Sequence, residues 1–260
     1  MRMTSGQLKL AARRCLLGKY GTCALLMLVF YLVSFVIQIP YQIINLVSSF
    51  LMVADMLVAS ILCNTLLFVY YILMCLMTYT LSAGMTRYFY RMVVGETCQI
   101  GDLFYFVTGR IMKTWGLNAL FLLMGFGPLF AAVLLGLGSL ALHGVDLISF
   151  TAVIIIYSIS ILIATVITCA AYLNYGLVYY IYNENPEMKV MQIYKESARL
   201  MKGNKARSFR LGLSFLGVGL LGIMSAGIGF IWIFPYLCCT SVYFYIDIKN
   251  EKASRCESYS

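Results

Sequence analysis

The chain has 260 residues, of which 62% are hydrophobic and 11% are charged, and its mean hydropathy is +0.89. Soluble domains carry about 25% charged residues, so this composition excludes a soluble globular domain and predicts an integral membrane protein. The single histidine, His143, excludes zinc motifs that need two histidines, and 10 acidic residues leave few metal-ligating clusters. We therefore expect no metal site and no cofactor.

Five long gaps between charged residues predict the membrane passes, because each exceeds the ~20 apolar residues that cross a ~30 Å hydrocarbon core. The first four gaps predict one helix each. The fifth contains Gly227, Gly229, Trp232 and Pro235 in its middle, and these residues favour a reversal between two helices. The predicted transmembrane helices are 21–39, 59–83, 115–139, 150–181, 209–229 and 232–248. The external stretch 40–58 is apolar enough to form a re-entrant or surface helix.

Lysine and arginine avoid every second connection between these helices. All 19 lie before the first helix, between helices two and three, between helices four and five, or in the tail. The other connections contain only Asp55, His143 and Asp146 as titratable groups. The positive-inside rule then predicts that both termini are cytoplasmic. We attribute the net charge of +9 to this orientation and to attraction for anionic lipids on the cytoplasmic side, in preference to nucleic-acid binding.

Three segments combine apolar residues at helical spacing with basic residues, and each lies just before a predicted transmembrane helix. They are residues 5–17, 100–114 and 187–202. Such amphipathic helices lie in the membrane interface. The predicted fold class is therefore all-α, a polytopic membrane protein with 1–260 as a single integral membrane domain. Its six transmembrane helices form three hairpins, each preceded by an amphipathic interfacial helix.

The region between helices four and five contains signals for the start and the end of a helix. Asn185 followed by Pro186 predicts an N-cap with proline at the first helical position, and Gly203 with Asn204 predicts a helix end. Four basic residues around this end suit lipid phosphates. They are Lys202, Lys205, Arg207 and Arg210. As an alternative, the same cluster binds a phosphorylated or anionic substrate headgroup.

The C-terminal third of the chain resembles a known family. The resemblance rests on Tyr182–Glu187, Ser197–Lys205, Leu213–Phe215, Gly227-Ile-Gly229, Trp232, Pro235-Tyr236 and Phe244-Tyr245, and on the N-terminal LKLAARRCLLGKYG. These stretches are similar to the bacterial domain-of-unknown-function family numbered 975. The middle of the chain departs from the family, because it lacks the Pro-Gly-Ile turn ahead of the fourth helix. The resemblance implies a polytopic bacterial cytoplasmic-membrane protein with no established activity, and it supplies no catalytic residue.

Small residues at four-residue spacing in the fifth predicted helix favour close helix packing in lipid. Gly222 is followed by Ala226, and Ser225 by Gly229. We therefore interpret Gly222 and Gly229 as packing positions.

Three asparagines are the polar candidates at membrane depth. Asn174 lies in the fourth predicted helix, whereas Asn64 and Asn118 lie nearer predicted helix ends. Asn174 either joins helices or contacts a substrate. No catalytic set of residues is found at depth, so the chain is not expected to be an enzyme. We expect a non-enzymatic scaffold or accessory subunit; the alternative is a transporter or lipid-handling protein for a small or amphiphilic solute. The expected partners are membrane lipids, and assembly with itself or with another membrane protein stays open.

Overall fold

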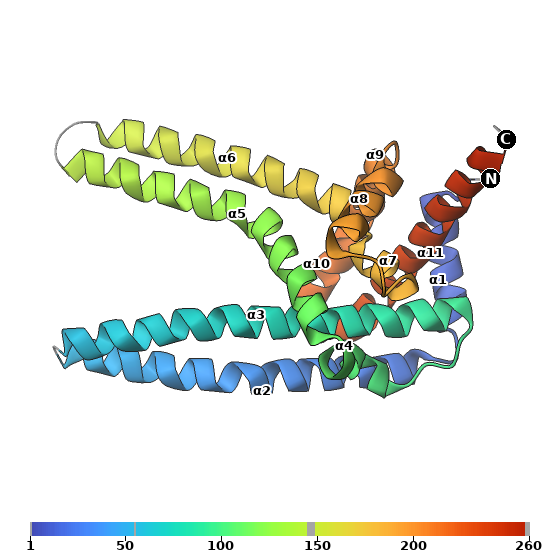
Figure 1. The fold of residues 1–260 in the computed structure, drawn as a ribbon, viewed down its shortest axis with the longest axis horizontal. Helices are drawn as coiled ribbons and strands as arrows, with labels where there is room; N and C mark the ends of the chain where they lie inside the picture. The colour runs from blue at the N-terminus through green and yellow to red at the C-terminus, as the bar shows by residue number, and fades with distance from the viewer. Residues whose placement is uncertain (1, 55, 145–148, 258–260) are drawn as a thin grey trace. The chain divides into compact units, whose positions relative to one another are not determined.

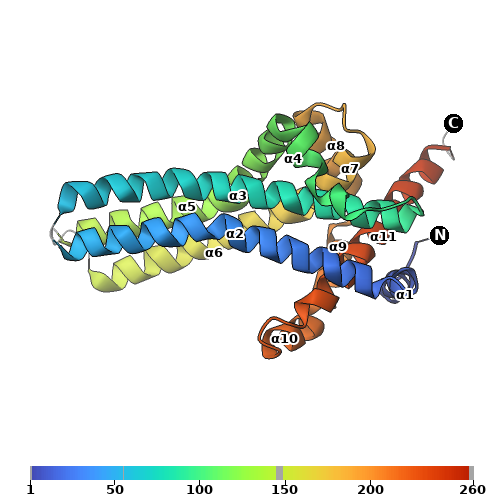
Figure 2. The same ribbon diagram turned by 90° about the horizontal axis from the view of Figure 1, so that it is seen from below.

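The structure is a computed structural model that describes residues 2–54, 56–144 and 149–257, and it contains no strand within these ranges (Figures 1 and 2). It divides into two compact units. Unit 1 comprises Met1–Trp115 and Leu211–Ser260, and unit 2 comprises Gly116–Arg210. Six helices are long and apolar enough to cross a membrane. They are Tyr20–Val53, Val58–Val94, Ile111–Gly144, Phe150–Glu184, Lys205–Met224 and Phe230–Ser254.

In unit 1, α2 (Tyr20–Val53) and α3 (Leu57–Val94) run side by side. The helix predicted to end at residue 39 continues through Pro40 to Val53, so residues 40–53 are not a separate re-entrant or surface helix but the C-terminal part of α2. Continuation is favourable because residues 40–53 are uncharged and a proline removes only one backbone donor. The Tyr70 hydroxyl donates a hydrogen bond to the Ile37 carbonyl at 2.6 Å, in the turn before Pro40, where proline loosens the backbone pairing.

The N-terminal helix α1 (Ser5–Leu16) packs against α11 (Phe230–Glu257). Thr4 and Gln7 form a capping box that starts α1. The buried face of α1 is spaced as one helical stripe and consists of Leu8, Ala12 and Leu16. The two ends of the chain are also joined, because Arg2 Nε donates to Glu251 at 2.7 Å.

The segment predicted as one helix over 100–114 is divided in the structure. It forms the 3-10 helix η1 (Ile100–Phe104) and the short helix α4 (Tyr105–Gly109), and after Arg110 the long helix α5 (Ile111–Gly144) begins. η1 lies directly against α3. A Cβ atom added to Gly84 of α3 would overlap the carbonyl group of Leu103. Only glycine permits this approach of the two backbones.

The predicted reversal in the fifth charge-free gap lies at Ser225–Gly229, between α10 (Leu216–Met224) and α11. Ala226 (φ 53°) and Gly227 (φ 87°) take left-handed conformations there. Pro235 lies inside α11 and does not break the helix. A further break at Ser214 and Phe215 separates α10 from α9 (Lys205–Leu213). Helix α11 crosses α2 and α3 obliquely in both views (Figures 1 and 2).

In unit 2, α5 and α6 (Phe150–Tyr175) run side by side, followed by α7 (Val178–Glu184) and α8 (Val190–Met201). Helix α8 starts three residues later than the predicted helix 187–202. Its apolar face is buried against α6 and α7. The Tyr194 hydroxyl donates to the Leu117 carbonyl at 2.8 Å, and Ser197 Oγ donates to the Asn174 carbonyl at 2.9 Å.

Candidate functional site

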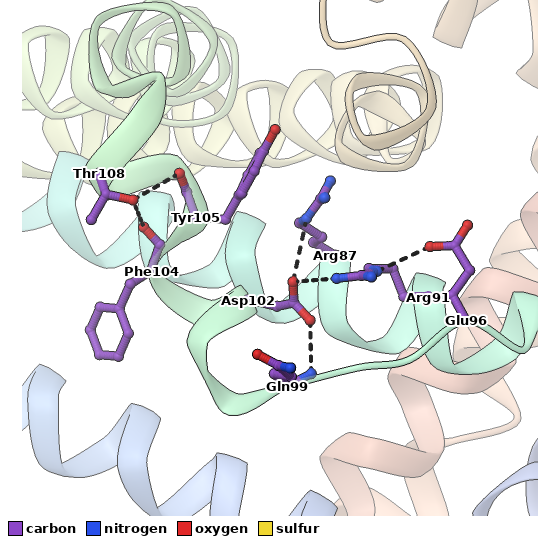
Figure 3. Close-up of polar contacts among 8 residues, drawn as sticks. All are labelled: Arg87, Arg91, Glu96, Gln99, Asp102, Phe104, Tyr105 and Thr108. Carbon is purple, nitrogen blue, oxygen red and sulfur yellow. Dashed lines mark hydrogen bonds and ion pairs between the residues drawn. The ribbon is translucent and has the colours of Figure 1, made fainter.

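A group of charged side chains in unit 1 surrounds Asp102, at the start of η1 (Figure 3). Its side chain is 9% exposed. The carboxylate accepts hydrogen bonds from Arg91 Nη1 at 2.7 Å and from the backbone N–H of Gln99 at 2.9 Å. Arg87 Nε lies 3.7 Å from the same carboxylate. Two positive side chains therefore share one buried negative charge.

The local sequence brings these groups together in three steps. Arg87 and Arg91 are four residues apart, so they project from one side of α3. Gly95, with φ 89°, then ends α3 in the left-handed conformation and reverses the chain. Glu96 follows the reversal and accepts a hydrogen bond from Arg91 Nε at 3.0 Å. The returning chain delivers Asp102 to both arginines.

Arg87 differs from Arg91 in how its hydrogen-bonding capacity is used. Its guanidinium carbon lies 3.8 Å from the centre of the Tyr105 ring, within range of a cation–π interaction. Its Nε atom is buried without a hydrogen-bond partner among the described residues. Figure 3 shows the end of the guanidinium turned away from Asp102. The cluster thus fastens η1 to α3 through Arg91 and leaves the Arg87 donors for another acceptor.

A second group of contacts in unit 1 surrounds Lys9 of α1. Lys9 Nζ donates to the Ser214 carbonyl at 2.8 Å and lies 4.2 Å from the centre of the Phe215 ring. The Phe215 ring packs edge-on against Tyr236, with centroids 5.2 Å apart. Burial lowers the pKa of Lys9, and the nearby charge of Arg13 lowers it further. Lys9 therefore caps the break between α9 and α10, where a backbone carbonyl would otherwise lack a donor.

Thiol groups of α1 and α11 form a third contact. The Cys15 thiol donates to the Met92 carbonyl at 3.9 Å, and Cys239 and Tyr243 lie close enough to influence its ionisation. The hydrogen bond from Cys239 lowers the pKa of Cys15 to about 6, although partial burial opposes the shift. Among the described residues the cysteines are free thiols.

The three predicted polar residues make separate contacts. Asn118 is fully buried and accepts a hydrogen bond from the Tyr179 hydroxyl at 2.9 Å. Asn64 donates within its own helix, to the Ser60 carbonyl at 2.9 Å. Asn174 is half-buried and lies one residue before the end of α6, inside the apolar span Phe150–Glu184. Each of the three is therefore placed near a helix end.

The predicted headgroup contacts follow α8 in sequence. Lys202, Lys205 and Arg210 are exposed, whereas Arg207 is half-buried. Their exposure is compatible with lipid contact, and no bound anion is needed to explain their geometry.

The helix signals around α8 are placed differently at its two ends. Gly203 adopts φ 87° directly after α8, and the Asn204 N–H donates to the Met201 carbonyl at 2.9 Å, so the predicted stop is present. The predicted start is wrong. Asn185 ends α7, Pro186 lies in the following turn, and Lys189 is the N-cap of α8. The Asn185 backbone carbonyl accepts a hydrogen bond from the Met188 N–H at 3.1 Å, which closes a short turn over residues 185–189. This turn moves the start of α8 to Val190.

The remaining motif residues lie in the α10–α11 region. A Cβ atom on Gly222 would lie 2.8 Å from the Phe230 ring, and one on Gly229 would lie 2.6 Å from Ser225 Oγ. Both glycines therefore occupy tight positions between α10 and α11. Tyr236 is buried, whereas Trp232 is 52% exposed.

Two acidic residues of the external connections, Asp55 and Asp146, lie outside the described residues. His143 is half-buried near the end of α5, and its ring centroid lies 5.7 Å from that of Phe150. Within the described ranges, no three His, Cys, Asp or Glu side chains are grouped to hold a metal ion.

Sequence reasoning missed the Asp102 cluster. Its signals were the spacing of Arg87 and Arg91 on one helix, and one acidic residue soon after the glycine that ends this helix. The pairing of Cys15 with Cys239 had no sequence signal, because 223 residues separate the two.

A family model described as "Protein of unknown function (DUF975)" matches residues 1–252. No curated protein and no solved structure matches the chain.

Proposed function

Since the chain belongs to the DUF975 family of proteins of unknown function, we propose from its own contacts that it is a non-catalytic polytopic protein of the cytoplasmic membrane. In this proposal it acts as a scaffold or accessory subunit. Its six long apolar helices cross the membrane as three hairpins, with both termini in the cytoplasm. The helices α1, η1–α4 and α8 lie at the cytoplasmic interface, with lipids as the immediate partners.

One observation carries the proposal: some polar side chains of the long helices form hydrogen bonds to the backbone of the neighbouring helix. Thr168 of α6 donates to the Gly125 carbonyl of α5 at 2.9 Å, and Tyr70 of α3 donates to the Ile37 carbonyl of α2. Hydrogen bonds of this kind hold helices together in lipid. A transport path would instead need polar groups that face water at membrane depth.

The small residues along α5 and α6 support the same function. A Cβ atom on Gly136 of α5 would overlap the Tyr157 ring of α6. Ser160 of α6 also reaches the Ala132 carbonyl of α5, at 3.5 Å. Close packing and cross-helix hydrogen bonds therefore occur over the same part of the helix pair, as expected for a rigid support.

The proposal is tested by water accessibility. Thr168→Cys and Asn250→Cys variants are exposed, in separate right-side-out and inside-out vesicles, to a membrane-impermeant thiol reagent. Modification at each introduced position is read by peptide mass spectrometry, so the native cysteines are retained. We expect no modification at position 168 from either side, and modification at position 250 only in inside-out vesicles.

Two results would overturn the proposal. Modification at position 168 would reveal a water-filled path and favour transport of a small or amphiphilic solute. Modification at position 250 in right-side-out vesicles would reverse the orientation of the tail. Lys205→Cys, at an exposed position, serves as the positive control for reagent access.

A further inference from the structure

We propose that Arg87 binds a phosphate group, with Tyr105 supporting its guanidinium. The Arg87 side chain has unused hydrogen-bonding capacity. A guanidinium has five N–H donors and no acceptor. Among the described residues, the nearest carboxylate oxygen is 3.7 Å from Nε, longer than a hydrogen bond, and Nε is buried without a partner. Nε is buried on the Asp102 side and is therefore closed to a ligand, whereas the terminal nitrogens point away from Asp102 (Figure 3), so an anion would bind at these terminal donors.

Arg87 also has a longer ionic contact than Arg91. Arg87 and Arg91 both face Asp102, and Arg91 takes the short contacts, at 2.7 Å to Asp102 and 3.0 Å to Glu96. Glu96 is 55% exposed and lies beside Arg91, so solvent screens its charge. Arg91 therefore takes the short contacts of both carboxylates, and Arg87 keeps only the 3.7 Å contact to Asp102. A phosphate would pair with the Arg87 charge at hydrogen-bond distance.

The Arg87 side chain is also preorganised. The Tyr105 ring holds the guanidinium at 3.8 Å, and the Arg87 side chain is only 20% exposed. A planar guanidinium with a fixed orientation presents two parallel N–H donors, which match two oxygens of a phosphate. Because the ring already restricts the side chain, little conformational entropy is lost on binding.

Arg87 also has a suitable position along the helix. No charged residue lies in α3 before Arg87, and residues 57–86 extend about 45 Å at 1.5 Å per residue. This length matches the roughly 40–45 Å of a bilayer with its headgroup regions. Arg87 is therefore the first charge at the edge of the apolar span, at the level of lipid phosphates. Arg87 has this position in whichever leaflet it lies, and the phosphate site does not depend on the scaffold function.

The ligand is thus a phosphate ester of a lipid headgroup or a free phosphate compound, and one experiment separates the two. The purified full-length protein is titrated with short-chain phosphatidylglycerol, with diacylglycerol, or with glycerol phosphate, and bound ligand is counted by native mass spectrometry. We expect phosphatidylglycerol to bind the parent protein at least about tenfold more tightly than Arg87→Gln, as for a charge-assisted hydrogen bond. Arg14→Gln, which removes an exposed charge, should bind like the parent.

The competition arms identify the source of the phosphate. If a lipid is the ligand, glycerol phosphate at the same concentration does not displace phosphatidylglycerol, because the acyl chains add binding. If a free phosphate compound is the ligand, glycerol phosphate binds alone and its binding is lost in Arg87→Gln. The proposal is overturned if Arg87→Gln binds phosphatidylglycerol as tightly as the parent does and also binds glycerol phosphate as tightly as the parent does. So does an equal loss in Arg14→Gln, because it would show only a general effect of net charge.

Folding of the variants is checked by circular dichroism and size-exclusion chromatography. If Arg87→Gln does not fold, Tyr105→Leu replaces it, since this variant keeps every charge and removes only the supporting ring. We then expect binding several-fold weaker than in the parent, as for loss of a cation–π contact. If Tyr105→Leu binds the phosphate ligand as tightly as the parent, the supporting role of the ring is overturned. If Arg87→Gln also fails to fold, this result overturns the proposed site as well.

Discussion

The Ser225 hydroxyl accepts a hydrogen bond from the backbone N–H of Gly229 at 2.8 Å. The same hydroxyl donates to the Gly222 carbonyl at 2.7 Å, and the Gly227 N–H reaches that carbonyl at 3.1 Å. One serine therefore satisfies backbone groups on both sides of the turn between α10 and α11. A turn paired in this way tolerates apolar surroundings, where unpaired backbone groups are costly.

Leucine in place of Gly222 or Gly229 should destabilise unit 1. The new side chain would meet Phe230 in the first case and Ser225 in the second, at distances that require neighbours to move. Overpacking of this kind costs about 1–3 kcal/mol. Thermal unfolding in detergent measures the effect. Gly219→Leu is the matched control, because its Cβ meets open space and leucine favours the helix. The packing role is refuted if Gly222→Leu and Gly229→Leu both melt at or above the parent.

Gly84→Ala should detach η1 from α3. The added methyl group would overlap the Leu103 carbonyl, and a backbone group cannot yield as a flexible side chain can. We expect a loss of about 1–3 kcal/mol and faster hydrogen exchange over residues 99–109. Gly101→Ala, with no atom near its Cβ position, should leave exchange in this segment unchanged. Unaltered exchange in Gly84→Ala would show that the close approach is dispensable.

Two residues of α8 should respond differently to substitution by aspartate. Tyr194 is 2% exposed and hydrogen-bonded to Leu117, whereas Met191 is 55% exposed. Tyr194→Asp should therefore release α8 and speed its hydrogen exchange. Tyr194→Phe, which loses only the hydroxyl, should cost about 1 kcal/mol.

Met191→Asp tests the proposed interfacial position of α8, because Met191 would face lipid rather than protein. In lipid nanodiscs we expect exchange of α8 to rise in Met191→Asp, by less than in Tyr194→Asp. If Met191→Asp exchanges like the parent, α8 does not use this residue to contact lipid.

Cys15 should react with iodoacetamide as a thiolate at neutral pH. Its pKa of about 6 is held down chiefly by the hydrogen bond from Cys239, so the rate should reach half its maximum near pH 6 and fall at lower pH. Cys239→Ala removes the donor, so the pKa should rise and the rate at pH 7 should drop roughly tenfold. Peptide mass spectrometry follows Cys15 alone. An unchanged pH profile in Cys239→Ala would exclude the assigned donor.

The sequence was a good guide to features that depend on local composition. The absence of charge over long stretches predicted six apolar helices, and Gly203 marked the end of α8 correctly. It was a poor guide where a local signal competed with helix continuation. The first helix was predicted to end at residue 39, and Pro235 was counted among the residues that favour a reversal. Pro40 and Pro235 both lie inside helices, because a single missing donor costs less than ending the helix in an apolar segment.

The candidate site required contacts that no local pattern contains. Asn185 and Pro186 were a plausible helix start, but the turn they form is set by the end of α7. The Asp102 cluster depends on how far the chain returns after Gly95, and this is determined by the close approach of Leu103 to Gly84. Packing between backbones, rather than charge spacing alone, therefore decides which ionic groups meet.

The lengths of the charge-free helices in unit 1 have a consequence for the surrounding lipid. Residues 57–86 of α3 extend about 45 Å, whereas the uncharged stretch Leu211–Met224 before the turn extends only about 21 Å. No single acyl-chain length matches both. Hydrophobic mismatch of this size is relieved by thinning the bilayer beside the short segment or by thickening it beside the long one. A membrane around this protein would then have an uneven thickness, and lipids would sort around it by chain length.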